Sequence, residues 1–333
     1  MSPRRAARLA WSVISTLLVR VLARLAPQRW CPPALSLRLF RASSAPGTAA
    51  YAEAVRTHLP PATWTTTAVA IPGGLIDLVI PDGPGPHPLV VWVHGGGWHF
   101  GDRSYPLPYL EMLASRGFAG ASLDYPLAPG ARYPAAPRQV NEALRYLVEQ
   151  AADDRIDPHR IVLAGDSAGA QLAAEVAALI TNPAYAASTT LIPALGPEQL
   201  RGALLFCGIY DPPALVDADR MFSAVLGSAM WSLTGTREWW SSEACRLMTV
   251  VDHVTAQFPP TLLAAGSHDP LTRRQHPSMA ARLREHGVLL EEFCPGDDAR
   301  PINHEFQFWL DTPEAAEALE RSIAFLSRVF SEG

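Results

Sequence analysis

The chain has 333 residues, enough for one large domain with a well-buried core or for two ordinary domains. Hydrophobic residues make up 48% of the chain and charged residues 18%, a composition that excludes wholesale disorder. The net charge of −5 provides no basic face, so the sequence predicts no nucleic-acid partner.

The N-terminal segment combines arginines with an apolar run at residues 9–19. It has the outline of a signal peptide, but further arginines follow at once and no A-x-A cleavage signature lies just beyond the run. The run is shorter than the roughly 20 residues that a membrane-spanning helix needs. We therefore expect an amphipathic helix that covers an active site or lies on a membrane surface, in a cytoplasmic protein, with export the less favoured alternative.

The next elements alternate between strands and helices. Two strands are expected at residues 65–71 and 75–80, joined by the turn Pro72-Gly73-Gly74 and therefore antiparallel. Further strands are expected at residues 89–93, 118–123, 160–164, 203–207, 261–265 and 289–293, and helices near 106–116, 135–150, 168–180, 277–286 and 313–330. This alternation predicts an α/β fold with a mostly parallel, eight-stranded, doubly wound sheet.

Residues 211–251 interrupt the alternation and are expected to form inserted helices. Their tryptophans, Trp231, Trp239 and Trp240, either pack a small core of the insertion or line an acyl pocket, and the sequence leaves both alternatives open. The four cysteines of the chain are scattered, show no metal-ligand spacing and are expected to be reduced.

The strongest motif is G-D-S-A-G at residues 165–169, between an expected strand and an expected helix. This is the context of the G-x-S-x-G nucleophile elbow, in which a strained turn exposes a serine, so we predict Ser167 as a nucleophile. A Cβ atom at residue 165 or 169 would collide with the neighbouring strand or helix, which explains both glycines. The backbone N–H of Ala168, at the helix N-terminus, is expected to stabilise an oxyanion.

A second motif, H-G-G-G-W, occupies residues 94–98 directly after an expected strand. Successive glycines let backbone amides approach a substrate carbonyl closely. The N–H groups of Gly95, Gly96 or Gly97 are therefore expected to complete an oxyanion hole with that of Ala168.

Three side chains beside these motifs receive roles of their own. His94 is expected to anchor the glycine loop rather than to act as a base. Trp98, next to the glycine loop, and Asp166, next to the nucleophile, are predicted to contact the substrate.

A catalytic acid is expected between Ser167 and a later histidine, because a triad of this fold runs in the order Ser, Asp or Glu, His. Asp269 is the first acid after the expected strand at 261–265, at the end of a parallel strand where active-site residues gather. Asp297 and Asp298 are alternative acids, but they follow the wrong strand.

The base is expected among the three histidines downstream of Asp269. His276 and His286 lie at the two ends of an expected helix, whereas His304 lies in a loop after the last strand. We therefore predict that His304 removes the proton from Ser167, and that Asp269 orients the imidazole and stabilises its charged form.

Taken together, these motifs resemble the hormone-sensitive-lipase-like, or bacterial family IV, branch of the α/β-hydrolase superfamily. The resemblance covers about residues 60–330 and includes the segments at 124–129 and 133–136 and Asp269-Pro270-Leu271. It implies a carboxylesterase that cleaves small-molecule esters with short to medium acyl chains through an acyl-enzyme intermediate, with no cofactor and no metal. It also implies a helical cap built from residues 1–55 and 211–251 over a core of residues 56–210 and 252–333.

The chain departs from the family pattern at three places. Thr272-Arg273-Arg274 stands where an acidic pair is usual, Ala170 where a glycine is common, and Glu305 where a small residue is frequent. The alternatives that remain are an amidase or aryl formamidase with the same triad and a non-catalytic small-molecule receptor on the same fold. Membrane contact through the N-terminal helix and a homodimer are both compatible with the sequence.

Overall fold

The protein is built around an eight-stranded sheet, which a computed structural model describes together with its surroundings for residues 50–216, 220–297 and 300–331. The strand order is β1-β2-β4-β3-β5-β6-β7-β8. The strands are β1 (Trp64–Ile71), β2 (Gly74–Pro81), β3 (His87–Val93), β4 (Ala119–Leu123), β5 (Ile156–Asp166), β6 (Leu200–Phe206), β7 (Thr261–Ala264) and β8 (Leu290–Phe293). Strand β2 is antiparallel to both β1 and β4, and the other neighbouring pairs are parallel. The predicted mostly parallel sheet with an antiparallel start is confirmed.

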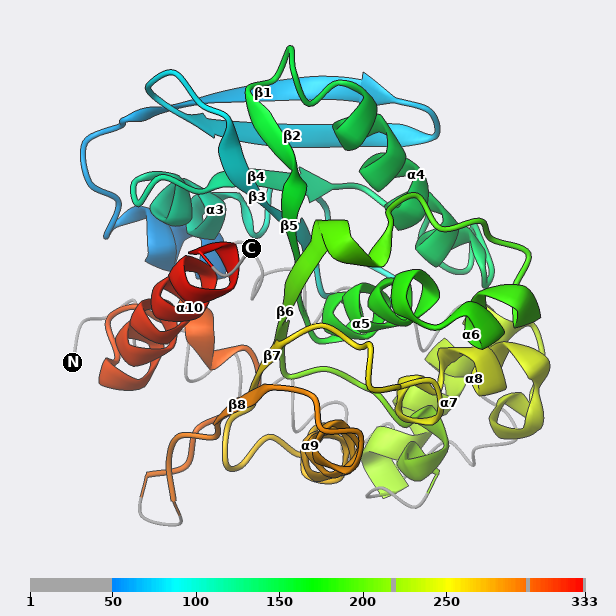
Figure 1. The fold of residues 1–333 in the computed structure, drawn as a ribbon. Coiled ribbons are helices and arrows are strands. Elements are labelled where there is room, and N and C mark those ends of the chain that lie inside the picture. Colours follow the sequence, from blue (N-terminus) through cyan, green and yellow to red (C-terminus); the bar gives the residue numbers. More distant parts are fainter. Residues whose placement is uncertain (1–49, 217–219, 298–299, 332–333) are drawn as a thin grey trace.

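Helices cover both faces of this sheet (Figure 1). Helices α3 (Leu107–Ala114) and α10 (Pro313–Ser331) lie on one face, and α4 (Ala135–Glu149), α5 (Ala168–Thr181) and α9 (Gln275–Glu285) lie on the other. A short helix that the sequence did not indicate, α6 (Pro183–Ser188), follows α5. The fold is thus doubly wound, as predicted.

Strand β3 shows why two layers of helices are needed. Leu89 and Val91 pack into the apolar core on the side of α4 and α5, whereas Val90 and Trp92 pack into the core on the side of α3 and α10. All four side chains are fully buried. Because successive strand residues point to opposite faces, an uninterrupted apolar run is stable only where both faces are covered.

The segment that interrupts the alternation is largely helical. It contains η2 (Pro212–Leu215), α7 (Arg220–Thr234), η3 (Trp239–Ser241), α8 (Glu243–Met248) and η4 (Val250–Asp252). Trp239 is buried, whereas Trp240 is 48% exposed and meets the edge of Trp239 at 5.8 Å between ring centroids. Of the two alternatives, packing into an apolar core therefore fits Trp239. That Trp231 and Trp240 line an acyl pocket stays a prediction.

The predicted N-terminal helix and most of the predicted cap segment 1–55 lie outside the described residues. Residues 50–55 are helical. Within the described ranges, no helix is both long enough and apolar enough to cross a membrane. Strand β5 begins at Ile156, earlier than predicted, because Ile156 pairs with His87 ahead of an irregularity in the β3–β5 ladder.

A buried carboxylate inside α5 binds three donors. Glu175 accepts hydrogen bonds from the hydroxyls of Tyr133 (2.7 Å) and Tyr185 (3.1 Å) and from Nε2 of Gln171 (2.8 Å). The side-chain oxygen Oε1 of Gln171 in turn accepts the indole N–H of Trp98 (3.0 Å). Burial raises the pKa of Glu175 to about 7, although the three donors act in the opposite direction.

Replacing Glu175 with glutamine is expected to change how stability depends on pH. A carboxyl whose pKa is raised by folding contributes stability that is complete below its unfolded pKa and is lost as the pH rises through its folded pKa. Between the ordinary value of 4.5 and about 7, this loss amounts to about 3 kcal/mol, at about 1.4 kcal/mol per pKa unit. Relative to the wild type, Glu175→Gln should therefore gain stability from about pH 4.5 to about pH 7, with no further gain at higher pH.

Urea unfolding at several pH values measures this difference. Glu149→Gln, at an exposed position near the end of α4, is the matched control and should give curves parallel to those of the wild type. Parallel curves for Glu175→Gln as well would contradict the buried-charge account.

Candidate active site

The turn between β5 and α5 holds Ser167 in a strained conformation. Strand β5 ends at Asp166 and α5 begins at Ala168, so Ser167 occupies the turn alone, with φ 53° and ψ −120°. A non-glycine residue with positive φ costs of the order of 1–3 kcal/mol and persists only where its surroundings enforce it. The strand–turn–helix context predicted for the motif is present.

The two glycines of the motif permit the close packing that this turn requires. A Cβ atom on Gly169 would lie 2.0 Å from the carbonyl oxygen of Val93, at the end of β3. A Cβ atom on Gly165 would lie 2.6 Å from backbone atoms of Gly169 at the start of α5. The predicted collisions with strand and helix are therefore confirmed.

The structure brings together the three residues singled out as nucleophile, base and acid. Nε2 of His304 lies 2.9 Å from Oγ of Ser167, and Nδ1 of His304 lies 2.6 Å from Oδ2 of Asp269. The second oxygen of Asp269 accepts the backbone N–H of Leu271 at 2.9 Å. Ser167, Asp269 and His304 follow β5, β7 and β8, so all three lie beyond the carboxyl ends of parallel strands.

Burial and mutual attraction together set the charges of Asp269 and His304. Burial alone would raise the pKa of Asp269, but the charge and hydrogen bond of His304 outweigh it and lower that pKa. Burial alone would lower the pKa of His304, but Asp269 and Cys207 outweigh it and raise that pKa well above its ordinary value. The arrangement therefore favours an ionised Asp269 and stabilises a proton on His304.

The residues that were weighed as alternatives lie elsewhere. Oδ1 of Asp297 accepts the backbone N–H of Arg300 in a local turn, and Asp298 lies outside the described residues. Nε2 of His276 lies 3.2 Å from Oε1 of Glu292, and burial lowers the pKa of His276 to about 4. His286 directly follows α9.

The glycine loop after β3 has a backbone that side chains would obstruct. Gly96 has φ 116°, and a Cβ atom on it would lie 2.1 Å from the carbonyl oxygen of Phe100. His94 is buried, stacks on Tyr125 with ring centroids 4.3 Å apart, and its Nδ1 lies 2.7 Å from the carbonyl oxygen of Gly95. Burial lowers the pKa of His94, so these contacts fit the anchoring role predicted for it.

Trp98 and Asp166 do not reach the position predicted for them. Trp98 is 1% exposed, with its indole N–H bonded to Gln171, and Asp166 is fully buried, with Oδ1 accepting the indole N–H of Trp92 at 2.8 Å. Both side chains are held by internal partners beneath the loop, so the structure does not support direct contact with a substrate.

Cys207 lies at the site, although no role there was predicted for it from the sequence. It directly follows β6, with its thiol buried, and its Sγ lies within 4.8 Å of the ligand atoms of Asp269 and His304. Within the described ranges, this is the one group of three side chains able to hold a metal ion. Two of the three, Asp269 and His304, already form a hydrogen bond with each other. The signal was the place of Cys207 at a strand end, which gains meaning only once β6 is known to neighbour β5 and β7.

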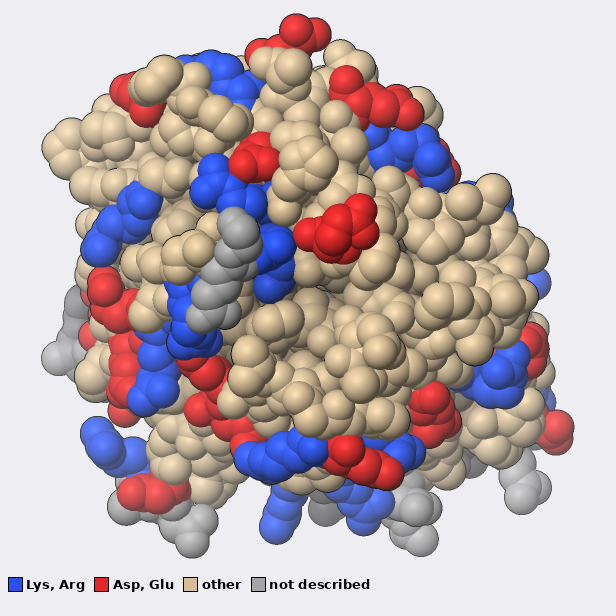
Figure 2. All heavy atoms as spheres, in the orientation of Figure 1, with Lys and Arg blue, Asp and Glu red and all other residues tan. Residues whose placement is uncertain are grey.

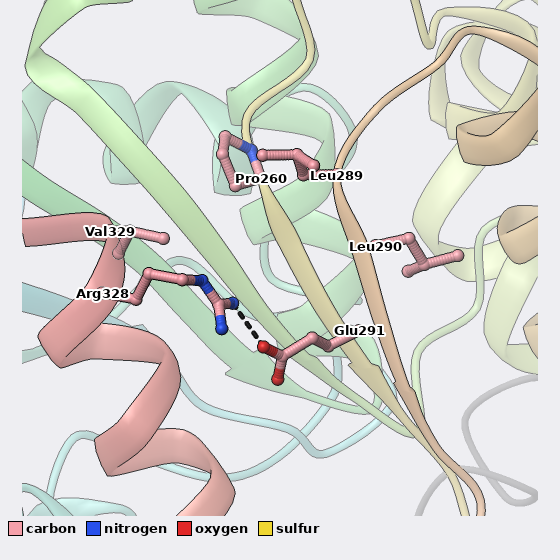
Figure 3. Close-up of a pocket in the computed structure, with 6 residues that line it drawn as sticks. All are labelled: Pro260, Leu289, Leu290, Glu291, Arg328 and Val329. Atoms are coloured by element: carbon pink, nitrogen blue, oxygen red, sulfur yellow. Dashed lines mark ion pairs between the residues drawn. The ribbon is translucent and has the colours of Figure 1, made fainter. Parts of the chain in front are cut away.

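A surface depression of about 170 Å³ lies at the other end of the sheet (Figure 3). It lies between the starts of β7 and β8 and the C-terminal part of α10, and is lined by Pro260, Leu289, Leu290, Glu291, Arg328 and Val329. Arg328 of α10 and Glu291 of β8 form an ion pair. The amino ends of parallel strands are not where active sites of open α/β sheets form.

In the view of Figure 2, basic and acidic side chains are interspersed and form no broad face of one charge.

Known proteins are similar to this chain in sequence and in fold. Residues 90–294 match a protein family described by the α/β hydrolase fold. The chain is 31% identical over 249 residues to carboxylesterase NlhH of Mycobacterium tuberculosis, covering 72% of this chain and 73% of that protein. It is 28% identical over 260 residues to an esterase of Gibberella moniliformis, covering 74% and 76%. The structure resembles Esterase B from Lactobacillus rhamnosis with a TM-score of 0.75 and 22% identity, covering 90% of this chain and 96% of that one.

Proposed function

Because the chain belongs to the hormone-sensitive-lipase-like branch of the α/β hydrolases and is a carboxylesterase-like hydrolase, we propose that it cleaves carboxylic esters through an acyl-enzyme intermediate on Ser167. The observation that carries the proposal is the hydrogen-bonded chain from Ser167 through His304 to Asp269. A serine hydroxyl is a weak nucleophile by itself and becomes effective when an oriented base accepts its proton.

In this mechanism His304 carries protons between the nucleophile and the leaving group. Nε2 of His304 accepts the proton of Ser167 as Oγ attacks the ester carbonyl, and then donates it to the departing alcohol. Water then attacks the acyl-enzyme as His304 accepts one of its protons. His304 returns this proton to Oγ of Ser167 as the bond between Oγ and the acyl carbon breaks, and the carboxylic acid leaves. Asp269 holds Nδ1 protonated, which leaves Nε2 free to accept.

The oxyanion of each tetrahedral intermediate is proposed to bind backbone N–H groups of the glycine loop and of Ala168. The loop begins directly against the nucleophile turn, since a Cβ atom on Gly169 would also lie 2.5 Å from the carbonyl oxygen of His94. The amides of Gly95, Gly96 or Gly97 and of Ala168, which begins α5, are therefore the proposed donors. Each donor of this kind contributes about 3 kcal/mol to transition-state stabilisation.

The helical segment 211–251 is proposed to form part of a cap over the site. Helix α7 contacts the chain next to the glycine loop: Oγ of Ser232 lies 2.6 Å from Nε2 of His99, and the carbonyl of Leu233 accepts the backbone N–H of Tyr133 at 3.0 Å. A cap in this place would exclude water and limit the length of the acyl chain, which supports esters of short to medium acyl chains as substrates.

Matched p-nitrophenyl esters and p-nitroanilides of increasing acyl length test the substrate class. We expect kcat/KM to be higher for each ester than for its anilide, with a maximum among short to medium acyl chains, because the alcohol is the better leaving group. Faster turnover of the anilides would favour an amidase or aryl formamidase, and ligand binding without turnover of either series would favour a receptor.

A further inference from the structure

Two carboxyl groups meet beneath the proposed oxyanion loop. Asp166 is fully buried and Glu305 is 8% exposed, and one oxygen of each carboxyl lies within 2.9 Å of the same point, the position that a Cβ atom on Gly95 would take. Among the described residues Oδ2 of Asp166 has no hydrogen-bond partner, and Oε2 of Glu305 accepts the hydroxyl of Tyr105 at 3.0 Å. Ionised carboxylates only accept hydrogen bonds, so a bond between the two requires a proton on one of them.

The surroundings favour a single proton on this pair. Burial, and then the neighbouring Glu305, raise the pKa of Asp166 well above its ordinary value. Burial together with Glu305 also raises the pKa of Tyr51 and Tyr105, so both remain neutral phenols. The other titratable groups here are Tyr125, whose pKa is raised by burial and by both carboxyls, His304, whose Nε2 is 3.9 Å from Oε1 of Glu305, and Cys207. Cys207 accepts the backbone N–H of Glu305 and has a pKa raised by burial.

The pair touches both halves of the proposed catalytic machinery. A Cβ atom on Gly95 would lie 2.1 Å from Oδ2 of Asp166 and 2.9 Å from Oε1 of Glu305, so the first glycine of the loop rests directly on the two carboxyls. Glu305 follows His304 in the chain and has φ 56°, a conformation that is costly for a non-glycine residue. A glutamate in such a position is held there by its contacts.

We propose that Glu305 is a positioning residue. Its carboxyl group, joined to that of Asp166 by one shared proton, keeps Gly95 and His304 in the positions that the reaction at Ser167 requires. This inference rests on the function proposed above. The shared proton keeps two like charges from repelling each other under the loop, while the bond between the carboxyls ties the segment after β8 to the last residue of β5. Oxyanion donors act only when they are held in place before the reaction, so loosening this tie should affect kcat more than KM.

Kinetics of Glu305→Ala and Glu305→Gln test the proposal. Alanine removes the tie and should lower kcat by about tenfold or more, part of the 10²–10³-fold cost of losing one oxyanion donor, with little change in KM. Glutamine can donate its amide N–H to Asp166 and accept from Tyr105, so it should restore kcat to within about threefold of the wild type. Glu314→Ala is the matched control, because Glu314 has a similar side-chain exposure, 14% against 11%, without contacting the site.

The pH profile gives a readout that a merely structural role would not change. In the wild type, loss of the shared proton should lower kcat at alkaline pH, because two carboxylates then face each other beneath the loop. Glu305→Gln and Asp166→Asn have no such proton to lose and should lack this alkaline decrease. These two conservative variants keep the test valid if Glu305→Ala does not fold.

Two results would overturn the proposal: wild-type kcat in a folded Glu305→Ala protein, or an unchanged alkaline limb in both conservative variants. Ser167→Ala is measured in the same series. If that variant retains turnover, the proposed function itself is wrong. If it is inactive while Glu305→Ala is fully active, only the role of Glu305 is refuted.

Discussion

Ser167→Ala should lower kcat by about 10⁶-fold, the cost typical of removing a triad serine, and leave the fold intact. The substitution removes the group that forms the acyl-enzyme, so turnover falls to what the oxyanion donors and substrate binding provide, about 10³–10⁴-fold above water. The fold survives because the backbone N–H of Ser167 still bonds to the carbonyl of Phe206 at 2.8 Å, and because alanine has a similar cost at φ 53°.

A fluorophosphonate probe and thermal unfolding measure the two halves of this prediction. The wild type should be labelled and Ser167→Ala should not, while the Tm values of the two proteins should agree within a few degrees. Ser104→Ala, at an exposed serine, is the control and should be labelled like the wild type. Labelling of Ser167→Ala, or turnover close to that of the wild type, would refute the assignment of the nucleophile.

Asp269→Asn is expected to lower kcat by about 10⁴-fold at neutral pH. Asparagine preserves the shape of the side chain but removes the charge that stabilises a protonated His304. It also presents an N–H where Nδ1–H of His304 needs an acceptor, which favours the wrong imidazole tautomer. Because Asp269 is 1% exposed, solvent cannot replace the lost interaction.

The alternative acid in the same region provides the control for this variant. Asp297→Asn should keep kcat close to that of the wild type, because the described contacts of Asp297 are with Arg300 in an exposed turn. Measuring kcat for both variants with one ester substrate decides between the two acids. A large loss for Asp297→Asn together with a small loss for Asp269→Asn would reverse the assignment.

Motifs with a strict backbone requirement were predictable from the chain alone. The glycines at 165 and 169 indicated a tight turn because only glycine fits such approaches, and the structure places backbone atoms within 2.6 Å of both virtual Cβ positions. The order of the triad residues restricted the acid and the base to a few positions. Trp98 and Asp166 were predicted to contact the substrate from their nearness to the motifs, but the structure buries both side chains, because nearness in sequence does not say which side of a loop a side chain occupies.

The sequence by itself determined the succession of strands and helices along the chain and the identity of Ser167, Asp269 and His304 as candidates. These are local properties, since apolar periodicity, turn glycines and chain order are all written along the chain. Only the tertiary structure decided that β6 lies between β5 and β7, which brings Cys207 beside Asp269 and His304. It alone also placed the carboxyl of Glu305 beside that of Asp166, 139 positions earlier (305 − 166), because contacts between segments so far apart depend on strand order and register.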